Sequence, residues 1–198
     1  MLAATHELDD ASLVRLRLTR PSDAALVPNS AEEAGHLDEH HLSLVAAAGL
    51  VPEHVTGPHP QLFRRFLLAM PTVSESTVRH FTFYDPRERM TFAAMALEDG
   101  SERMVGVADA AFLETGLAEI GVVVDDSHQG RGVGKLLSEA VASLAIKRGA
   151  THLKAQMLSD NVPMLRLFER LGRTVRAIDD GTSTAYVRLS ADGRRSAA

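Results

Sequence analysis

The stretch Glu119-Ile-Gly-Val-Val-Val-Asp-Asp-Ser-His-Gln-Gly-Arg-Gly-Val-Gly134 decides the fold, because it combines a strand pattern with a glycine-rich turn. Its first half alternates β-branched residues with a period of two, which predicts a strand with at least one buried face. After the turn, apolar residues recur at helical spacing from Val133 to Ala145 and predict a helix that ends at Gly149. The sequence therefore predicts a strand, a turn and a helix in direct succession.

The turn between strand and helix has the composition of an anion site. Gly130, Gly132 and Gly134 let the backbone come close to a ligand. The first N–H groups of the helix have no internal partners and lie at the positive end of its dipole, so a pyrophosphate would fit there. The order Q-G-R-G-V-G differs from the dinucleotide fingerprint G-x-G-x-x-G, which belongs near the first strand of a chain.

At these residues the chain resembles the GNAT superfamily of N-acetyltransferases. Its pyrophosphate loop, [Q/R]-x-x-G-x-[G/A], is matched by Gln129, Gly132 and Gly134. The pattern from Glu119 through the helix, with Asn-Val-Pro-Met-Leu-Arg-Leu-Phe at 161–168, is similar to the bacterial protein-lysine acetyltransferase branch. The resemblance covers about residues 72–190 and the first strand. It implies an α/β (α+β) fold, with a mixed, mostly antiparallel twisted sheet that is flanked by helices and splayed at the cofactor strand to receive pantetheine.

The resemblance also implies acetyl-CoA as co-substrate and assigns roles to residues. Glu119 is expected to be the general base that takes a proton from an amine. A backbone N–H from the Val123–Val124 part of the strand would donate to the thioester oxygen. The expected cofactor contacts are Val122, Val123, Val124, Gln129, Gly130, Arg131, Gly132, Val133, Gly134, Lys135 and Asn161. For Asn161, a plain helix cap is an equal alternative.

The chain departs from the family pattern where the leaving thiolate would be protonated. Phe168 occupies the position at which many family members have a tyrosine, and Gly172-Arg173 replaces the usual Gly-Phe. Water, Tyr84 or Tyr186 could serve instead as general acid. His128, beside the glycine loop, is interpreted as a surface turn residue.

Composition limits the remaining classes of function. The chain has 198 residues, of which 45% are hydrophobic and 24% charged, so we expect one domain over 1–190 and a frayed tail at 191–198. The absence of cysteine excludes disulfides, thiolate metal sites and a cysteine nucleophile. A net charge of −5 gives no general drive toward nucleic acid. No signal peptide or membrane span is recognised, so a cytoplasmic location is expected.

Residues 24–70 are expected to form a helical, acidic insertion over the acceptor side of the sheet. No Lys or Arg occurs between Arg20 and Arg64, whereas six carboxylates do. These charges would either steer a cationic acceptor or form an ordinary solvated helix face. His36, His40 and His41 have a spacing that could bind metal, but H-E-x-x-H is absent and no metal is expected.

The predicted activity is transfer of an acetyl group from acetyl-CoA to a primary amine by direct attack. The acceptor is left open between a protein lysine and a small amine, as is assembly into a homodimer. The alternative is a catalytically weak acyl-CoA-binding regulatory module. Strands are expected at 13–19, 91–97, 104–113, 119–125, 151–158, 174–178 and 184–189, and helices at 30–49, 61–70, 74–81, 133–149 and 161–171.

Overall fold

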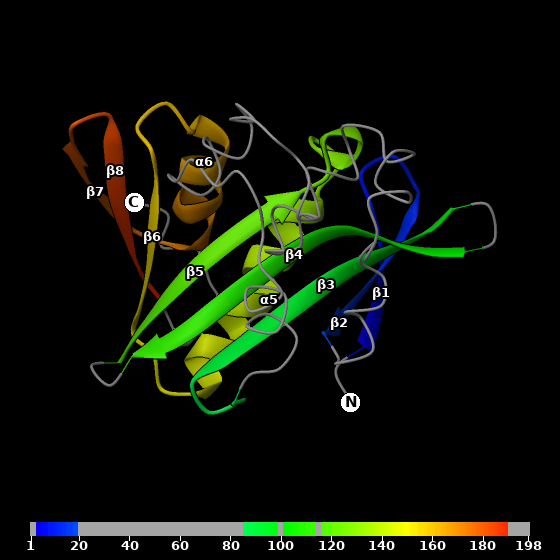
Figure 1. Cartoon of the computed structure of the whole chain (residues 1–198), viewed down its shortest axis with the longest axis horizontal. Helices are drawn as coiled ribbons and strands as arrows, with labels where there is room; N and C mark the ends of the chain where they lie inside the picture. The colour runs from blue at the N-terminus through cyan, green and yellow to red at the C-terminus, as the bar shows by residue number, and fades with distance from the viewer. Residues whose placement is uncertain (1–2, 20–84, 99–100, 114–115, 190–198) are drawn as a thin grey trace, which may run out of the picture.

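The computed structural model describes residues 3–19, 85–98, 101–113 and 116–189. These residues form one eight-stranded sheet with the order β1-β2-β3-β4-β5-β6-β8-β7 (Figure 1). The strands are β1 Ala3–Glu7, β2 Leu13–Leu18, β3 Arg89–Glu98, β4 Ser101–Leu113, β5 Leu117–Val124, β6 His152–Leu158, β7 Thr174–Asp179 and β8 Thr182–Arg188. The helices are the short 3-10 turn η2 Asp126–His128, α5 Val133–Lys147 and α6 Val162–Leu171. None of these helices has the length and apolar character needed to cross a bilayer.

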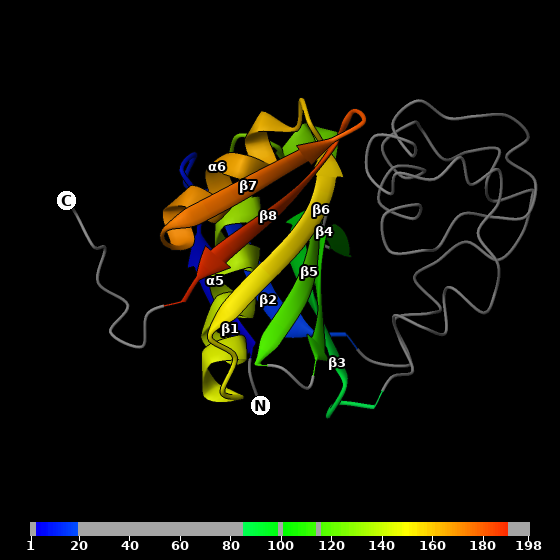
Figure 2. The same cartoon turned by 90° about the vertical axis from the view of Figure 1, so that its left-hand side faces the viewer.

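The predicted fold class is confirmed. Neighbouring strands are antiparallel throughout the described sheet except for β5 and β6, which run parallel and are joined through α5. Both α5 and α6 cover the same face of the sheet (Figure 2). The opposite face, turned toward the viewer in Figure 1, carries neither of these two helices and is for that reason called the open face below.

The helix α5 packs closely on the sheet because a glycine of the sheet lies beneath large apolar side chains of the helix. Leu137, Val141 and Ala145 lie on one side of α5 and are fully buried. Gly106 of β4 lies under this helix, where an added Cβ would be 2.9 Å from Cδ1 of Leu137. A side chain at this position would therefore push α5, and the loop that precedes it, away from the sheet.

The parallel pairing of β5 with β6 is short. It comprises three registered pairs and ends at Glu119 and Lys154, whereas β6 continues in register with β8 as far as Leu158. From Ile120 to Val124, β5 therefore pairs among the described strands with β4 alone. This confirms the predicted parting of the strands. The region beyond Glu119 where β5 and β6 diverge, visible in Figure 1, is called the splay below.

Strand β1 was not predicted. Ala3-Ala-Thr-His-Glu7 has neither apolar alternation nor a run of β-branched residues, so its sequence gives no strand signal. It pairs with β2 in an antiparallel hairpin, and the turn of this hairpin places Ala11 at a φ of 63°. The other expected strands and the two later helices are present, with ends that differ from the expectation by a few residues. The acidic insertion at 24–70, the helices expected at 30–49, 61–70 and 74–81, and the tail at 191–198 lie outside the described residues.

Gly172 provides a test of packing at the end of α6. A Cβ added to this residue would lie 2.5 Å from the carbonyl oxygen of Arg188, and a backbone atom cannot rotate away. We expect Gly172→Ala to lower the free energy of unfolding by about 1–3 kcal/mol, the usual effect of overpacking. Gly121→Ala is the matched control, because a Cβ there meets no atom of the described residues within 4 Å. Urea unfolding of both variants measures the difference, and equal stabilities would contradict the expectation.

Candidate active site

The loop between β5 and α5 has the geometry that the glycine pattern predicted. Gly130 and Gly132 have φ values of 75° and 98°, in the left-handed region that favours glycine. Gly132 is the N-cap residue of α5, and within the described part of the chain no side-chain hydrogen bond caps this end. The first turn of α5 contains no acidic residue. Its backbone N–H groups therefore remain available to an anion at the positive end of the helix.

A buried carboxylate holds the end of β5 in place. Asp125 is fully buried, and its Oδ2 accepts a hydrogen bond from Nη2 of Arg103 at 2.9 Å. Its Oδ1 accepts from the backbone N and the Oγ of Ser127, at 2.8 and 2.6 Å. Its own backbone N donates to the carbonyl oxygen of Val105 on β4. The role of Asp125 was not predicted, although Asp followed two positions later by Ser is a turn signal that could have indicated it.

The prediction for His128 was wrong. This side chain is 5% exposed, so it is buried and does not lie on the surface. Its Nδ1 lies 2.9 Å from the Oγ of Ser127 and 4.0 Å from Oδ1 of Asp125. His128 ends η2, and its backbone N donates a hydrogen bond to the carbonyl of Asp125.

Hydrogen bonding at the end of β5 shows which backbone groups face the splay. The backbone N–H of Asp125 bonds to β4. Because the N–H groups of successive strand residues point to opposite sides, the N–H of Val123 also points toward β4. The N–H groups of Val122 and Val124 then point toward the splay. In agreement, the carbonyl oxygen of Val124 accepts a hydrogen bond from Nε2 of Gln129 at 3.2 Å. Gln129 thus lies at the boundary between the splay and the glycine loop.

The glycine loop is fastened to the β1–β2 hairpin through Arg131. Its Nε lies 2.6 Å from Oδ2 of Asp10, and its Nη2 donates to the Oγ of Ser12 at 3.0 Å. Its backbone carbonyl accepts from the N–H of Asp9 at 3.3 Å. This contact was not predicted, because Arg131 and Asp10 are 121 positions apart in the sequence. The guanidinium therefore braces the loop from the side of the hairpin.

The other predicted contacts surround the same loop. A Cβ added to Gly134 would lie 3.4 Å from Cδ1 of Leu167 and 3.5 Å from Cγ2 of Val124, so glycine lets α5 approach α6 and β5 closely. Val133 is buried beneath the loop, and Lys135 is exposed in the first turn of α5.

Asn161 is the N-cap of α6, because its Oδ1 accepts a hydrogen bond from the backbone N of Met164 at 3.1 Å. The cap reading is thus observed, and the cofactor contact stays a prediction. Phe168 is fully buried in the core between α6 and the sheet. Tyr186 is 40% exposed on β8, and Tyr84 lies outside the described residues.

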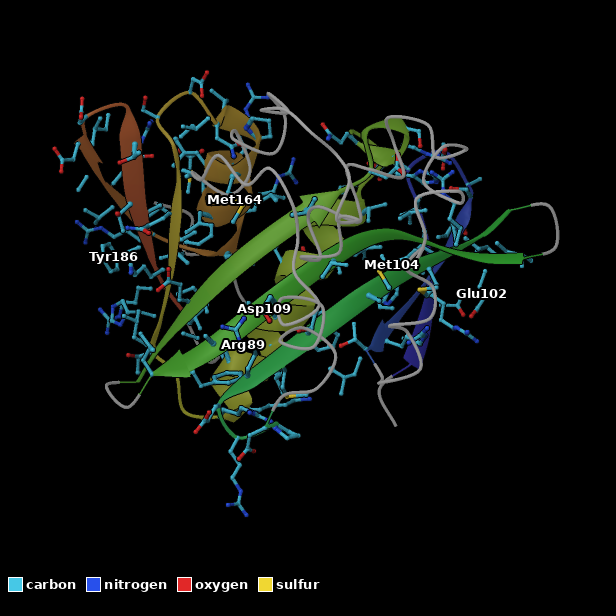
Figure 3. All side chains as sticks on the ribbon, in the orientation of Figure 1. Arg89, Glu102, Met104, Asp109, Met164 and Tyr186 are labelled. Atoms are coloured by element: carbon cyan, nitrogen blue, oxygen red, sulfur yellow. The ribbon has the colours of Figure 1, made fainter. Side chains whose placement is uncertain are left out.

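Glu119 lies at the opposite end of the splay from the glycine loop. It belongs to a row that crosses the sheet in register through Arg89, Ala111, Glu119, Lys154 and Tyr186. Its Oε2 lies 3.0 Å from Nζ of Lys154. The row occupies the open face, on which Figure 3 labels Arg89 and Tyr186.

A second ion pair lies beside this row. Nη1 of Arg89 is 2.5 Å from Oδ2 of Asp109, and the other carboxylate oxygen of Asp109 accepts from Oγ1 of Thr91 at 2.8 Å (Figure 3). Asp109 is in register with Gly121, two residues beyond Glu119 on β5. The open face thus carries the carboxylate of Glu119 at the start of the splay and, beside it, the carboxylate of Asp109, which is paired with Arg89.

Comparison with known proteins shows which family this chain is similar to. The model of the acetyltransferase (GNAT) family matches residues 60–172, more than half of the chain. Acetyltransferase Pat of Mycolicibacterium smegmatis is 37% identical over 70 residues, which cover 33% of this chain and 21% of Pat. Acetyltransferase PA5475 of Pseudomonas aeruginosa is 28% identical over 127 residues, which cover 64% of this chain and 68% of that protein. The chain thus corresponds to about a fifth of Pat and about two thirds of PA5475.

Solved structures share the fold. The GNAT domain of S. lividans PAT superposes with a TM-score of 0.68 at 24% identity, over 94% of this chain and 97% of that domain. A cAMP-binding acyltransferase from Mycobacterium smegmatis gives a TM-score of 0.58 at 18% identity, over 95% of this chain and 47% of that protein. These similarities support the fold of the chain as a whole.

The hairpin contact predicts a pH-dependent contribution to stability. Hydrogen bonds from the side chain and backbone of Ser12, followed by the Arg131 guanidinium, lower the pKa of Asp10 from 3.8 to about 2. A lowered carboxyl pKa stabilises the fold above the unfolded value, and this contribution is lost as the pH falls from about 4 toward about 2. Asp10→Asn should therefore reduce stability at neutral pH, by an amount that shrinks in this acid range.

Urea unfolding of the wild type and Asp10→Asn at about pH 7, 4 and 3 measures this difference. Glu7→Gln, an exposed position on the same hairpin, is the control that should leave stability nearly unchanged. A difference between the wild type and Asp10→Asn that stayed constant over the three pH values would show that the carboxylate charge contributes nothing.

Proposed function

Since the chain belongs to the acetyltransferase (GNAT) family, we propose that it transfers an acetyl group from acetyl-CoA to a primary amine, with Glu119 as general base. The observation that carries this proposal is the placement of two features along β5. The glycine loop follows its carboxyl end, and Glu119 lies where β6 begins to part from it. About 17 Å of strand separates Glu119 from Val124 at 3.3–3.4 Å per residue, and the pantetheine arm would run along this length so that the thioester meets the acceptor amine near Glu119.

The residues present fit the pyrophosphate of acetyl-CoA. Two glycines with positive φ expose the loop backbone, and the uncapped, acid-free first turn of α5 offers N–H groups to an anion. Lys135 adds a cation at the same turn, and Gln129 connects the loop to the splay. We assign to Arg131 the role of holding the loop backbone in its binding conformation, because its guanidinium contacts Asp10 and Ser12.

The splay is proposed to receive the pantetheine arm. The backbone groups of Val122 and Val124 point into it, whereas the N–H of Val123 is directed toward β4. One of the two available N–H groups would donate to the thioester oxygen, where negative charge develops during acyl transfer. The carboxylate of Glu119 would take the proton that the acceptor ammonium must lose before it can attack.

The acceptor is proposed to be a primary amine, either a protein lysine or a small molecule. The open face presents carboxylates at Glu119 and Asp109, which are paired with Lys154 and Arg89, so an approaching ammonium would have to displace one of these cations. Tyr186 shares a cross-strand row with Glu119 and is exposed, so it is the described side chain best placed to protonate the leaving thiolate. Phe168 cannot do so, because it has no titratable group and is fully buried.

The loop assignment predicts a loss of cofactor binding in Gly132→Val. Acetyl-CoA should raise the melting temperature of the wild type, because binding to the native state adds about 2.7 kcal/mol at 100 times Kd. A valine at a φ of 98° would distort the loop, and its side chain would enter the space beside Asp9. Gly181→Val is the control, since Gly181 has a φ of 77° and open surroundings in a distant turn.

Both variants should lose stability, but only Gly132→Val should lose most of the thermal shift with acetyl-CoA. A thermal shift that survives in Gly132→Val would exclude the loop as the pyrophosphate site.

If Glu119 is the general base, its substitution should slow acetyl transfer without preventing the binding of acetyl-CoA. Glu119→Gln keeps the shape of the side chain but cannot accept the proton, so the rate of acetyl transfer at about pH 7 should fall by roughly 10²–10⁴-fold. Binding of acetyl-CoA should remain, and activity should partly return as the pH approaches the pKa of the amine. Glu139→Gln, on the exposed side of α5, is the matched control.

Thiol release from acetyl-CoA with a panel of amines and lysine peptides measures the effect. Unchanged activity of Glu119→Gln at neutral pH would rule out its role as base. Binding of acetyl-CoA without transfer to any amine would instead favour the regulatory binding module.

A further inference from the structure

Among the described residues, the cation nearest to the proposed general base is a lysine. Nζ of Lys154 lies 3.0 Å from Oε2 of Glu119, across the last registered pair of β5 and β6. A general base must lie within about 2.6–3.2 Å of the atom that carries the proton it removes. The Lys154 ammonium meets this condition, and it therefore occupies the position that an acceptor amine would need.

The surroundings of Lys154 differ from those of the other lysines. The whole sequence contains three, at positions 135, 147 and 154. Lys135 and Lys147 are exposed at the two ends of α5, whereas the side chain of Lys154 is only 22% exposed. Uncatalysed acetylation by a thioester should favour exposed amines, so Lys154 would be the least reactive of the three without help from the site.

We propose that Lys154 is an acetyl acceptor within its own chain, a proposal that rests on the function proposed above. Glu119 takes one proton from the Lys154 ammonium, and the free amine attacks the thioester carbon. An N–C bond forms and the C–S bond breaks. The second proton leaves the nitrogen, the thiolate of CoA is protonated, and Glu119 returns its proton to water. Lysine ammonium and acetyl-CoA thus give acetyl-lysine, CoA thiol and one proton.

The position of Lys154 on the sheet supports this step. The two strands part directly beyond the Glu119 and Lys154 pair, so the ammonium lies at the closed end of the splay that is proposed to receive pantetheine. A lysine side chain has four methylene groups, which let Nζ turn from the carboxylate toward the splay while its backbone stays in register. The product amide remains attached to the chain, so the reaction should stop after one acetyl group.

The experiment incubates the full chain with acetyl-CoA in the absence of any amine. Thiol release, intact mass and peptide mapping by mass spectrometry are followed together. We expect one thiol and one acetyl group per chain, located at Lys154, with a rate constant independent of protein concentration. Glu119→Gln should slow this labelling by roughly 10²–10⁴-fold. Lys154→Arg, which keeps the cation, should abolish it, and the exposed Lys147→Arg should not change it.

Several outcomes would overturn the proposal. Labelling of Lys135 and Lys147 as fast as Lys154, or labelling of Lys154 that depends on protein concentration, would show reaction outside the site. Transfer to external amines without modification of Lys154 would reject the proposal and leave the proposed function intact. Binding of acetyl-CoA with no transfer to either would reject both. Mapping on the wild-type chain keeps the test valid even if Lys154→Arg folds poorly.

Discussion

The structure depends on the parting of β5 from β6. A strand in the middle of a sheet normally satisfies its backbone groups on both sides. Here β5 is paired on both sides only as far as Glu119, and the backbone groups of Val122 and Val124 face the splay. Unpaired backbone groups are costly when they are shielded from water, so a splayed strand is stable only if something else binds them. Gln129 does this for the carbonyl of Val124, and the remaining groups are suited to an extended, amide-containing ligand such as pantetheine.

Two anchors keep the parted strand and its loop in place. Asp125 ties the end of β5 to Arg103 on β4, and the burial of this carboxylate makes the pair hard to replace, since removing one partner of a buried pair typically costs about 3–5 kcal/mol. Arg131 ties the following loop to Asp10 in the β1–β2 hairpin. The loop is therefore held from the sheet on one side and from the N-terminal hairpin on the other. A rigid loop loses little conformational entropy when an anion binds, which favours binding.

Local sequence patterns predicted the fold because the decisive stretch carries both relevant periods. Alternation identified β5, helical spacing identified α5, and the glycines between them matched residues that the structure places at positive φ. The contacts that complete the site are long-range, such as Arg131 with Asp10 and Glu119 with Lys154. No local pattern encodes the register of two parallel strands joined through a helix. The burial of His128 was missed for a related reason, because burial depends on packing between distant parts of the chain and not on the local turn pattern.

The charge of the acceptor position depends on Lys154. With its ammonium beside Glu119, the pair is neutral overall, and an incoming ammonium would have to compete with a cation that is already bound. A neutral side chain at position 154 would leave the carboxylate as the dominant charge, and an external cation would then be attracted to it. The nearby carboxylate of Asp109 contributes less to this balance, because Arg89 neutralises it. A single lysine on β6 thus governs the net charge that an acceptor amine would encounter beside the proposed base.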